Sequence, residues 1–312
     1  MKYNKVIVTT TINKPSEALI KFSLMKDWKL IIVGDLKTPH NEFLKMKNII
    51  YLSPKKQEKL FKNLSDMIGW NCIQRRNLGF VYANKIGAEI IATVDDDNIP
   101  KANWGKNLII NKKIKIKKYI TNNIVFDPIG VTNHNHLWHR GYPLELIKKK
   151  NNILRTKNTY VNNINVQADF WDGDPDIDAI ERMTLNFKNC KFKESYFPFC
   201  SNKISPFNSQ NTFLSKKVLK HYFMFPSVGR MDDIWASYYV QALGYKVAYC
   251  KSSVVQIRNI HDYTKDFKNE VIGYLNNYEL ILSLTKNPLS IKKFIPKKSY
   301  LAFKEYQKYF LN

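Results

Sequence analysis

The stretch "EIIATVDDDN" (residues 89–98) decides how the rest of the sequence is interpreted. An apolar, β-branched run ends there in three consecutive carboxylates, Asp95, Asp96 and Asp97. Like charges at such short separation repel and raise one another's pKa unless a positive group lies among them. We therefore interpret the stretch as a buried strand whose carboxyl end gathers its acids around a divalent cation. The alternative is a solvated acidic turn leading to Asn98 and Pro100.

The composition limits the class of protein. The 312 residues are 44% hydrophobic and 13% aromatic, which is enough for a sizeable core and argues against disorder. The length fits one large domain or two small ones. The net charge of +24 leaves three explanations open: a nucleic-acid partner, an anionic membrane or substrate, or a compositional preference for Lys and Asn. Nucleic acid is the least favoured partner, because no zinc-finger, RRM or basic-region signature is present.

The cysteines and the apolar runs indicate a compartment. No two of the four cysteines have C-x-x-C spacing, which predicts reduced thiols in a cytoplasmic protein. The first residues, "MKYNKVIVTT", lack the pattern of a signal peptide. No apolar run approaches the ~20 residues that span a bilayer. We expect a cytoplasmic protein whose contact with a membrane, if any, is peripheral and at the inner membrane face.

The first hundred residues alternate between two patterns. Strands are predicted at residues 5–10, 29–35, 48–53 and 89–94, and helices at residues 18–25, at 55–67 and after 77. Because these strands are apolar on both faces and alternate with helices, we expect a parallel sheet in an α/β fold. The middle of the chain, 101–204, is predicted to hold substrate-facing loops and some strand within 117–126. The chain is then predicted to form a helix that begins at residue 233 and stops at Gly244. A strand and a helical tail from about residue 262 follow.

Polar side chains follow several of the predicted strands. Ligands of open α/β sheets bind outside the carboxyl ends of the strands. Asp95 and Asp97 are two residues apart and can both reach one cation, with Asp96 turned to the other side. Carboxylate oxygens suit Mg²⁺ or Mn²⁺, which also take phosphate oxygens of a substrate. The other polar residues expected at this edge are Thr9, Thr10, Thr11 and Asp35.

Two arginines precede the helix that begins near residue 77. They belong to "QRRNLG" (residues 74–79). Arg75 and Arg76 could clamp a phosphate there. The alternative is a pair of surface charges at a helix start.

A series of collinear blocks resembles a known family. The blocks are "VTTTINKPS", "IIVGDLKTP", "YLSPKKQEKL", "RRNLGFVYANKIGAEIIATVDDDN", "HRGYPLELI", "QADFWDGDPDIDAIERM", "SPFNSQNTF", "PSVGRMDDIWASYYVQ" and "QIRNIHDYTKDF". Together, over residues 6–267, they resemble the STELLO family of glycosyltransferase-like proteins. "DDDN", "RGYP" and "DDIWA" are more distantly similar to the reversibly glycosylated polypeptides, which include the UDP-arabinopyranose mutases.

The resemblance implies a GT-A fold, a nucleotide-sugar donor and an Asp-x-Asp metal site. It implies a Rossmann-like sheet with helices on both faces, over residues 1–262, followed by a helical extension over 263–312. Asp95 and Asp97 fall on the metal motif, and Mn²⁺ or Mg²⁺ is the expected cofactor. His261 matches a late histidine that GT-A folds often supply to the metal; its alternative is a structural role. The residues expected on the donor side are Thr9, Thr10, Asp35, Arg76 and Asp96.

Arg140 is the residue on which a second interpretation depends. It matches the arginine of "RGYP" that can carry the sugar in the reversibly glycosylated relatives. Ile147 stands where those relatives have a second arginine. Ordinary sugar transfer is therefore the favoured interpretation. A nucleotide-sugar mutase or self-glycosylating protein acting through Arg140 is the second.

An acidic pair in "GRMDDIWASYY" (residues 229–239) begins a predicted helix, where the dipole favours carboxylates. In GT-A enzymes a pair at this place commonly faces the acceptor. We expect Asp232 and Asp233 to be catalytic and favour Asp233 as the base. The alternative is a helix N-cap.

The acid-rich stretch "DFWDGDPDIDAI" (residues 169–180) lacks the full pattern of a calcium loop and is interpreted as a loop over the substrate. Trp171 could stack on a sugar face or pack in the core. Asp172 and Asn208 are placed on the acceptor side. The three histidines of a middle loop, His134, His136 and His139, are interpreted as acceptor-side or structural.

These expectations combine into one function with two rivals. We expect a metal-dependent transfer from a nucleotide sugar, most simply a UDP-sugar, to a glycan or lipid-linked glycan acceptor. The rivals are the mutase chemistry at Arg140 and a non-catalytic, basic nucleic-acid-binding or scaffold protein. The segment 106–120 alternates Lys and Ile around residues 113–117, which in a strand places Lys113, Lys115 and Lys117 on one face. That face would either be simply solvated or meet an anionic membrane.

Overall fold

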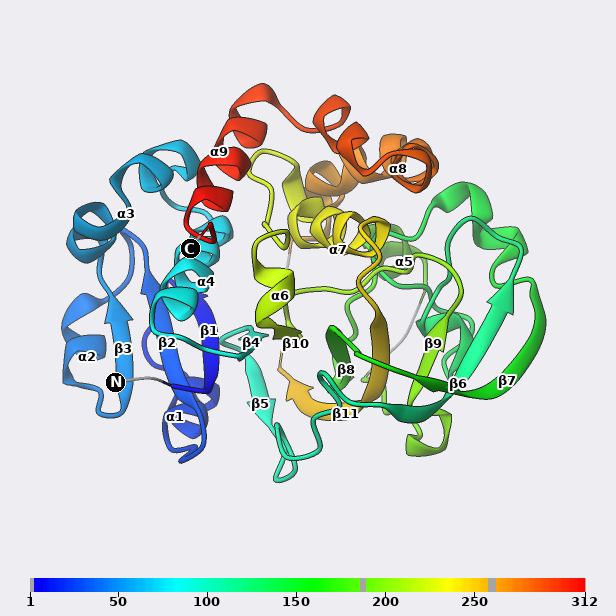
Figure 1. Cartoon of the computed structure of the whole chain (residues 1–312), viewed down its shortest axis with the longest axis horizontal. Coiled ribbons are helices and arrows are strands. Elements are labelled where there is room, and N and C mark those ends of the chain that lie inside the picture. The colour runs from blue at the N-terminus through cyan, green and yellow to red at the C-terminus, as the bar shows by residue number, and fades with distance from the viewer. Residues whose placement is uncertain (1–2, 186–188, 258–261, 312) are drawn as a thin grey trace.

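The computed structural model describes residues 3–185, 189–257 and 262–311 (Figure 1). Within these ranges the chain forms an eleven-stranded sheet flanked by helices, with strand order β3-β2-β1-β4-β10-β8-β11-β9-β6-β7, and with β5 paired to β11. The prediction of an α/β fold is confirmed.

The N-terminal half of the sheet is parallel, as predicted. Its strands are β1 (Lys5–Thr11), β2 (Lys29–Gly34), β3 (Ile49–Leu52) and β4 (Ile90–Val94). β1 lies between β2 and β4, and the side chains of all three are almost entirely buried. Burial on both faces explains why each strand reads as a continuous apolar run. The four predicted strands are thus confirmed within one or two residues at each end.

The helices of this half are α1 (Glu17–Ser23), α2 (His40–Lys45), α3 (Pro54–Ile68) and α4 (Arg76–Lys85). Ser16 and Ser53 cap α1 and α3 by accepting hydrogen bonds from Leu19 N and Lys56 N. α4 packs closely on the sheet, since a Cβ on Gly79 would come within 2.4 Å of a Val8 methyl carbon. The predicted helices are confirmed. The structure adds α2, which is only six residues long and was too short to be predicted from its sequence pattern.

The sheet changes direction at β10 (Asn211–Ser215), which is antiparallel to both β4 and β8. Beyond it, β8 (Val166–Gly173) and β11 (Val247–Gln256) pair in parallel. The other strands here are β5 (Asn98–Pro100), β6 (Ile114–Thr121), β7 (Ile153–Val161) and β9 (Phe199–Ser201). The middle of the chain is therefore more regular than predicted. β8 in particular includes the first part of the acid-rich stretch that was interpreted as a loop.

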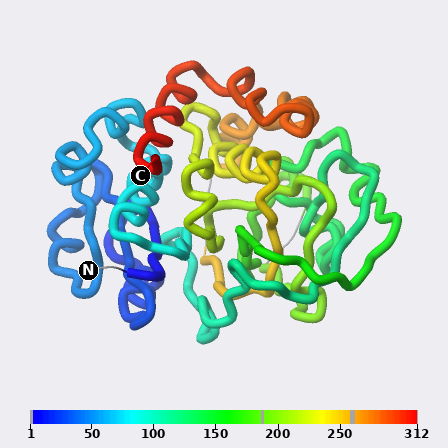
Figure 2. Tube along the Cα trace, viewed as in Figure 1, coloured from blue at the N-terminus to red at the C-terminus, as the bar shows by residue number. Residues whose placement is uncertain are grey.

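The C-terminal half carries the helices α5 (Ala179–Thr184), α6 (Lys216–Leu219), α7 (Asp232–Ala242), α8 (Tyr263–Lys286) and α9 (Lys297–Lys308). α7 ends before Gly244, whose φ of +91° suits a helix stop, as predicted. α8 and α9 arch over one side of the molecule and bring the chain back beside α3 and α4 (Figures 1 and 2). The hydrogen bond from Asn84 Nδ2 to Tyr309 O, 3.0 Å long, joins the tail to the N-terminal half.

Three further predictions concern the lysines around β6, the thiols and membrane-spanning helices. In and just before β6, Lys113 and Lys115 are exposed, Ile116 is buried and Lys117 is half-buried, so the expected alternation is confirmed. Cys72, Cys190, Cys200 and Cys250 are all free thiols, as predicted. In the described ranges, no helix combines the length and the apolar character that crossing a membrane requires.

Candidate active site

A cleft opens where the carboxyl end of β4 faces the start of α7. Its volume is about 300 Å³, and its walls carry both signs of charge. The charged groups that line it are Asp95, Asp97, Arg140, Asp176, Arg230, Asp232 and Asp233. The structure thus brings together the two acidic sites and the arginine that the sequence singled out separately.

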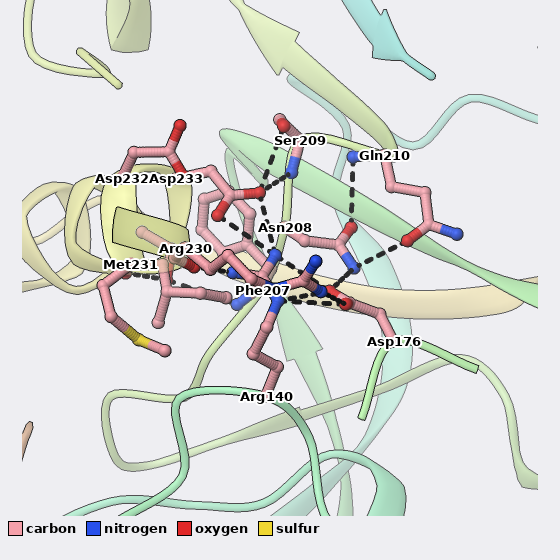
Figure 3. Close-up of polar contacts among 12 residues, drawn as sticks. Arg140, Asp176, Phe207, Asn208, Ser209, Gln210, Arg230, Met231, Asp232 and Asp233 are labelled. Atoms are coloured by element: carbon pink, nitrogen blue, oxygen red, sulfur yellow. Dashed lines mark hydrogen bonds and ion pairs between the residues drawn. The ribbon is translucent and has the colours of Figure 1, made fainter. Parts of the chain in front are cut away.

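Arg140 lines the cleft and lies between two carboxylates, those of Asp176 and Asp233 (Figure 3). Its Nε and Nη2 donate to Asp176 at 2.9 and 3.0 Å, and Nη2 also reaches Asp233 Oδ1 at 3.2 Å. Burial alone would lower the pKa of Arg140, but the two carboxylates outweigh it and raise the pKa well above its usual value. The guanidinium is therefore a permanent, buried positive charge.

Asp232 and Asp233 form the first turn of α7, as predicted, but neither caps it. Met231 stands at the N-cap position, where no side-chain hydrogen bond is made. Asp233 Oδ2 accepts from the backbone N and the hydroxyl of Ser209, at 2.8 and 3.1 Å. Asp232 accepts from Gln74 Nε2 at 2.8 Å. Burial first, and then the charge of Asp233, raise the pKa of Asp232 to about 7. Asp232 therefore binds a proton more readily than an ordinary aspartic acid.

Part of the positive charge expected among the three acids comes from the protein itself. Arg76 is fully buried and donates from Nη2 to Asp95 Oδ1 at 2.7 Å. Its Nη1 donates to Ser209 O and Oγ, both at 3.0 Å. Asp95 and Asp97 line the cleft, whereas Asp96 turns away from it and accepts from Thr11 Oγ1 at 2.5 Å. The predicted opposite orientation of Asp96 is confirmed.

The view of Arg75 and Arg76 as surface charges is wrong, because both are buried. Arg75 donates to Gln57 Oε1 and Ser65 Oγ, each at 2.8 Å, and its guanidinium lies 3.4 Å from the centre of the Trp70 ring. These contacts tie the start of α4 to α3. Arg75 is a structural clamp within the protein.

A second hollow, of about 220 Å³, adjoins the same acidic turn. Asp35 sits in its wall and is almost fully buried. Its Oδ1 accepts from Leu36 N and Asn71 N at 2.6 and 2.9 Å, and its Oδ2 accepts from Cys72 N at 3.0 Å. Asp35 therefore shapes the loop that closes the hollow. The other residues lining it are Thr10, Thr11, Ile12, Asn13, Asn71, Cys72, Ile73, Arg75 and Asp96. Thr9 is buried in β1 and is not among its lining residues.

Comparison with known proteins supports the resemblance seen in the sequence. No family model matches the chain. Two curated proteins of Arabidopsis thaliana, "Probable glycosyltransferase STELLO1" and "Probable glycosyltransferase STELLO2", are each 24% identical to it, over 261 and 256 residues. Each alignment covers 77% of this chain. The resemblance to the STELLO family is confirmed. The chain spans about a third of the length of these relatives, 33% in each case.

A solved structure is also similar to this STELLO-like chain. It is the glucosyl-3-phosphoglycerate synthase of Mycobacterium tuberculosis, crystallised with phosphoglyceric acid. The TM-score is 0.46 and the sequences are 12% identical, with 89% of this chain and 80% of that one covered.

The residues assigned to the acceptor side do not all reach the cleft. Asn208 does lie beside it, with Nδ2 donating to Asp176 Oδ2 at 2.7 Å. Trp171 is 3% exposed and stacks on Phe170, so it occupies the position of a core residue, as in the alternative interpretation. Asp172 pairs with Lys101 Nζ at 2.7 Å and does not line the cleft. Its assignment to the acceptor side stays a prediction, with no support from the lining of the cleft.

The histidines contribute little to the described site. His261 lies outside the described residues. His139 is buried, and its Nδ1 lies 2.8 Å from Arg140 O, which indicates a structural role. His134 is part of a surface loop and contacts Lys191 O. Among the described residues, no group of three or more His, Cys, Asp or Glu side chains is arranged to hold a metal.

The acidic turn nevertheless fits a divalent cation. Asp95 and Asp97 both face the cleft, and Mg²⁺ or Mn²⁺ is commonly held by one or two carboxylates, with water and phosphate oxygens completing its shell. Asp95 keeps one oxygen beyond the one that binds Arg76. Two carboxylates on one turn, next to an open cleft, are a donor set of this kind.

Some residues of the cleft escaped the sequence analysis. Asp176 lies within the acid-rich stretch but was given no role. Arg230, two residues before the acidic pair, donates from Nε to Glu270 Oε1 at 2.8 Å and from Nη1 to Asp266 Oδ1 at 3.0 Å. Both carboxylates belong to α8, so the helical tail helps to hold the wall of the cleft. The remaining lining residues that the sequence does not single out are Ile73, Ser209, Gln210, Met224, Gly229 and Gln256.

Proposed function

We propose that this chain is a metal-dependent glycosyltransferase, which moves a sugar from a nucleotide sugar such as a UDP-sugar to a glycan or lipid-linked glycan acceptor. The arrangement of the acidic turn carries the proposal. Asp96 lines the hollow beside Asp35, while Asp95 and Asp97 line the cleft that holds Asp232. A nucleoside in the hollow would therefore have its diphosphate at the turn and its sugar in the cleft.

Each group then has a task that its environment supports. Mn²⁺ or Mg²⁺ held by Asp95 and Asp97 would neutralise the charge of the departing diphosphate. Asp232, with a pKa of about 7, is suited to accept the proton of an acceptor hydroxyl near neutral pH. The sequence favours Asp233 as the base. Its carboxylate, however, already accepts hydrogen bonds from Arg140 and Ser209, so we assign it the role of holding the wall of the cleft in place.

The direct test is turnover of the donor. Incubation of the protein with a panel of UDP-sugars and Mn²⁺ should release UDP when a suitable acceptor is present, and release should stop when EDTA removes the metal. Donor binding without any turnover across a broad acceptor panel would instead favour a non-catalytic protein.

The structure disfavours self-glycosylation at Arg140. A guanidinium paired to two buried carboxylates is fully charged, and a charged guanidinium is a poor nucleophile. We therefore expect intact-mass spectrometry after incubation with donor to show no added pentose or hexose. A stable sugar adduct mapped to Arg140 would establish the mutase or self-glycosylating function in place of transfer.

Contact with an anionic membrane at the basic face of β6 stays a prediction. Each exposed lysine near such a surface contributes about 1 kcal/mol of binding free energy. We expect retention on anionic vesicles that falls with salt and weakens when Lys113, Lys115 and Lys117 become Gln. In the matched control, the exposed Lys55, Lys59 and Lys62 on α3 become Gln, and retention on the vesicles should stay as in the unaltered protein. Equal retention on neutral and anionic vesicles, or none on either, would remove the membrane role.

A further inference from the structure

A third cavity, of about 340 Å³, shares no lining residue with the cleft. Its volume lies within the ~300–1,000 Å³ typical of small-ligand sites. β8 and β11 form its floor, the loop after β5 forms one wall, and the residues that lead into β9 form the other. Because successive strand residues face opposite sides, Gln167 and Asp169 face this cavity together, while Phe170 packs in the aromatic core.

Asp169 lies in the floor of this cavity and is 7% exposed. Gln167 Nε2 donates to its Oδ1 at 2.8 Å, and the Ser253 hydroxyl also hydrogen-bonds to it. No Lys, Arg or His of the described residues forms an ion pair with it. Burial raises the pKa of Asp169 to about 7. The charge of Lys251, which lines the same cavity, opposes this shift but does not cancel it. A buried carboxyl outside any salt bridge is costly, and in a cavity wall it marks a candidate binding site.

The other lining groups indicate what kind of ligand fits. Asn103, Asn107 and Gln167 supply amides, and Phe197 and Pro198 supply apolar surface. The lining lysine, Lys251, is already paired with Glu194 at 3.0 Å. Each carboxyl oxygen of Asp169 has lone pairs left for a further donor. The carboxyl would repel a phosphate, whereas the hydroxyls of a neutral sugar can donate to it and accept from the amides.

We propose that this cavity is a binding site for a neutral saccharide unit, separate from the cleft. The site would hold part of a glycan chain by hydrogen bonds to Asp169 and the neighbouring amides, with the sugar ring against Phe197 and Pro198. The inference rests on the proposed function only in that a glycan acceptor would bring such a unit to the protein.

The test uses neutral trisaccharides and hydrogen–deuterium exchange of the backbone. Residues 103–109 include one wall of this cavity, and residues 71–75 include part of the hollow beside Asp35. Isothermal titration with maltotriose, cellotriose, xylotriose and arabinotriose is expected to reveal binding of at least one. Peptide mapping of the exchange should show that this sugar protects residues 103–109 and leaves residues 71–75 unchanged. Exchange of residues 71–75 in the presence of UDP and Mn²⁺ reports separately on the proposed donor site.

Two variants make the test specific. Asp169→Asn keeps the size of the side chain and an oxygen for Gln167. At a pH about 1.5 above the pKa of Asp169, where the carboxyl is charged, the change is expected to weaken saccharide binding at least about tenfold, since hydrogen bonds to charged groups are the stronger ones. Asn107→Trp obstructs the exposed wall without touching the buried carboxyl and should also weaken binding. Asp66→Asn, on exposed α3, is the matched control and should leave affinity unchanged. No binding by any trisaccharide, binding that does not protect residues 103–109 from exchange, or an affinity that both cavity variants leave unchanged would overturn the proposal.

Discussion

We expect Asp232→Asn to lower turnover by about 10²–10⁴-fold, which is the range typical of a lost general base. Affinity for the nucleotide donor should change little, because Asp232 lies across the cleft from the acidic turn, at the start of α7. The asparagine oxygen can still accept from Gln74 Nε2, so the local structure should persist. Steady-state kinetics with UDP release as the readout, together with donor titration, measure both quantities.

The dependence on pH gives this prediction a second readout. The pKa of Asp232, about 7, lies above the ordinary value of an aspartic acid. Activity that needs the charged form should rise as pH increases through about 7, and the variant should lose this rise. The folded state binds the proton more tightly than the unfolded state, so the contribution of Asp232 to stability falls as pH increases from about 4 to about 7.

Asp233→Asn is the informative comparison, because the two residues differ in what they contact. Asp233 binds Arg140 and Ser209, so its loss should weaken the packing of the cleft and lower the melting temperature. If Asp233→Asn abolishes turnover at an unchanged melting temperature while Asp232→Asn keeps both turnover and its pH profile, Asp233 is the base. The assignment from the sequence would then replace the one from the geometry.

The parallel half of the sheet was predictable because its signals are local. The strand that ends at Asp95 is apolar on both faces and stops at charged residues, and Ser16 marks the helix start that follows β1. β8 was not predictable in the same way. Gln167, Asp169 and Asp172 interrupt its apolar pattern, and their polarity makes sense only once the cavity and Lys101 are seen beside them.

The ion pairs in the wall of the cleft join residues that are far apart in the chain. Arg140 is 36 residues from Asp176 and 93 from Asp233, and no local pattern selects these pairs. The ion pair of Arg76 is not visible in the sequence for the same reason, because its partner Asp95 meets it only through the pairing of β1 with β4 and the packing of α4. A sequence shows which side chains carry charge, but burial and pairing are decided by contacts across the fold.

The metal site provides the second large effect. We expect Asp97→Ala to raise the dissociation constant of UDP in the presence of Mn²⁺ by at least about 10–100-fold, since even residues that only orient metal ligands have effects of this size. EDTA should weaken UDP binding to the unaltered protein to a similar extent and should have no further effect on the variant. Titration calorimetry with and without EDTA measures both, and Asp66→Asn on exposed α3 again serves as the control.

Asp95→Ala should show the same loss of metal-dependent binding together with a loss of stability. Its carboxylate accepts from Arg76 at 2.7 Å, and removing it leaves a fully buried guanidinium without that partner. Breaking one side of a buried ion pair is strongly destabilising. The melting temperatures of the two variants, measured beside their affinities, separate a loss of metal binding from a loss of stability. Donor affinity that is unchanged in both variants, with and without EDTA, would show that the three acids serve Arg76 and the fold and that no metal acts at this turn.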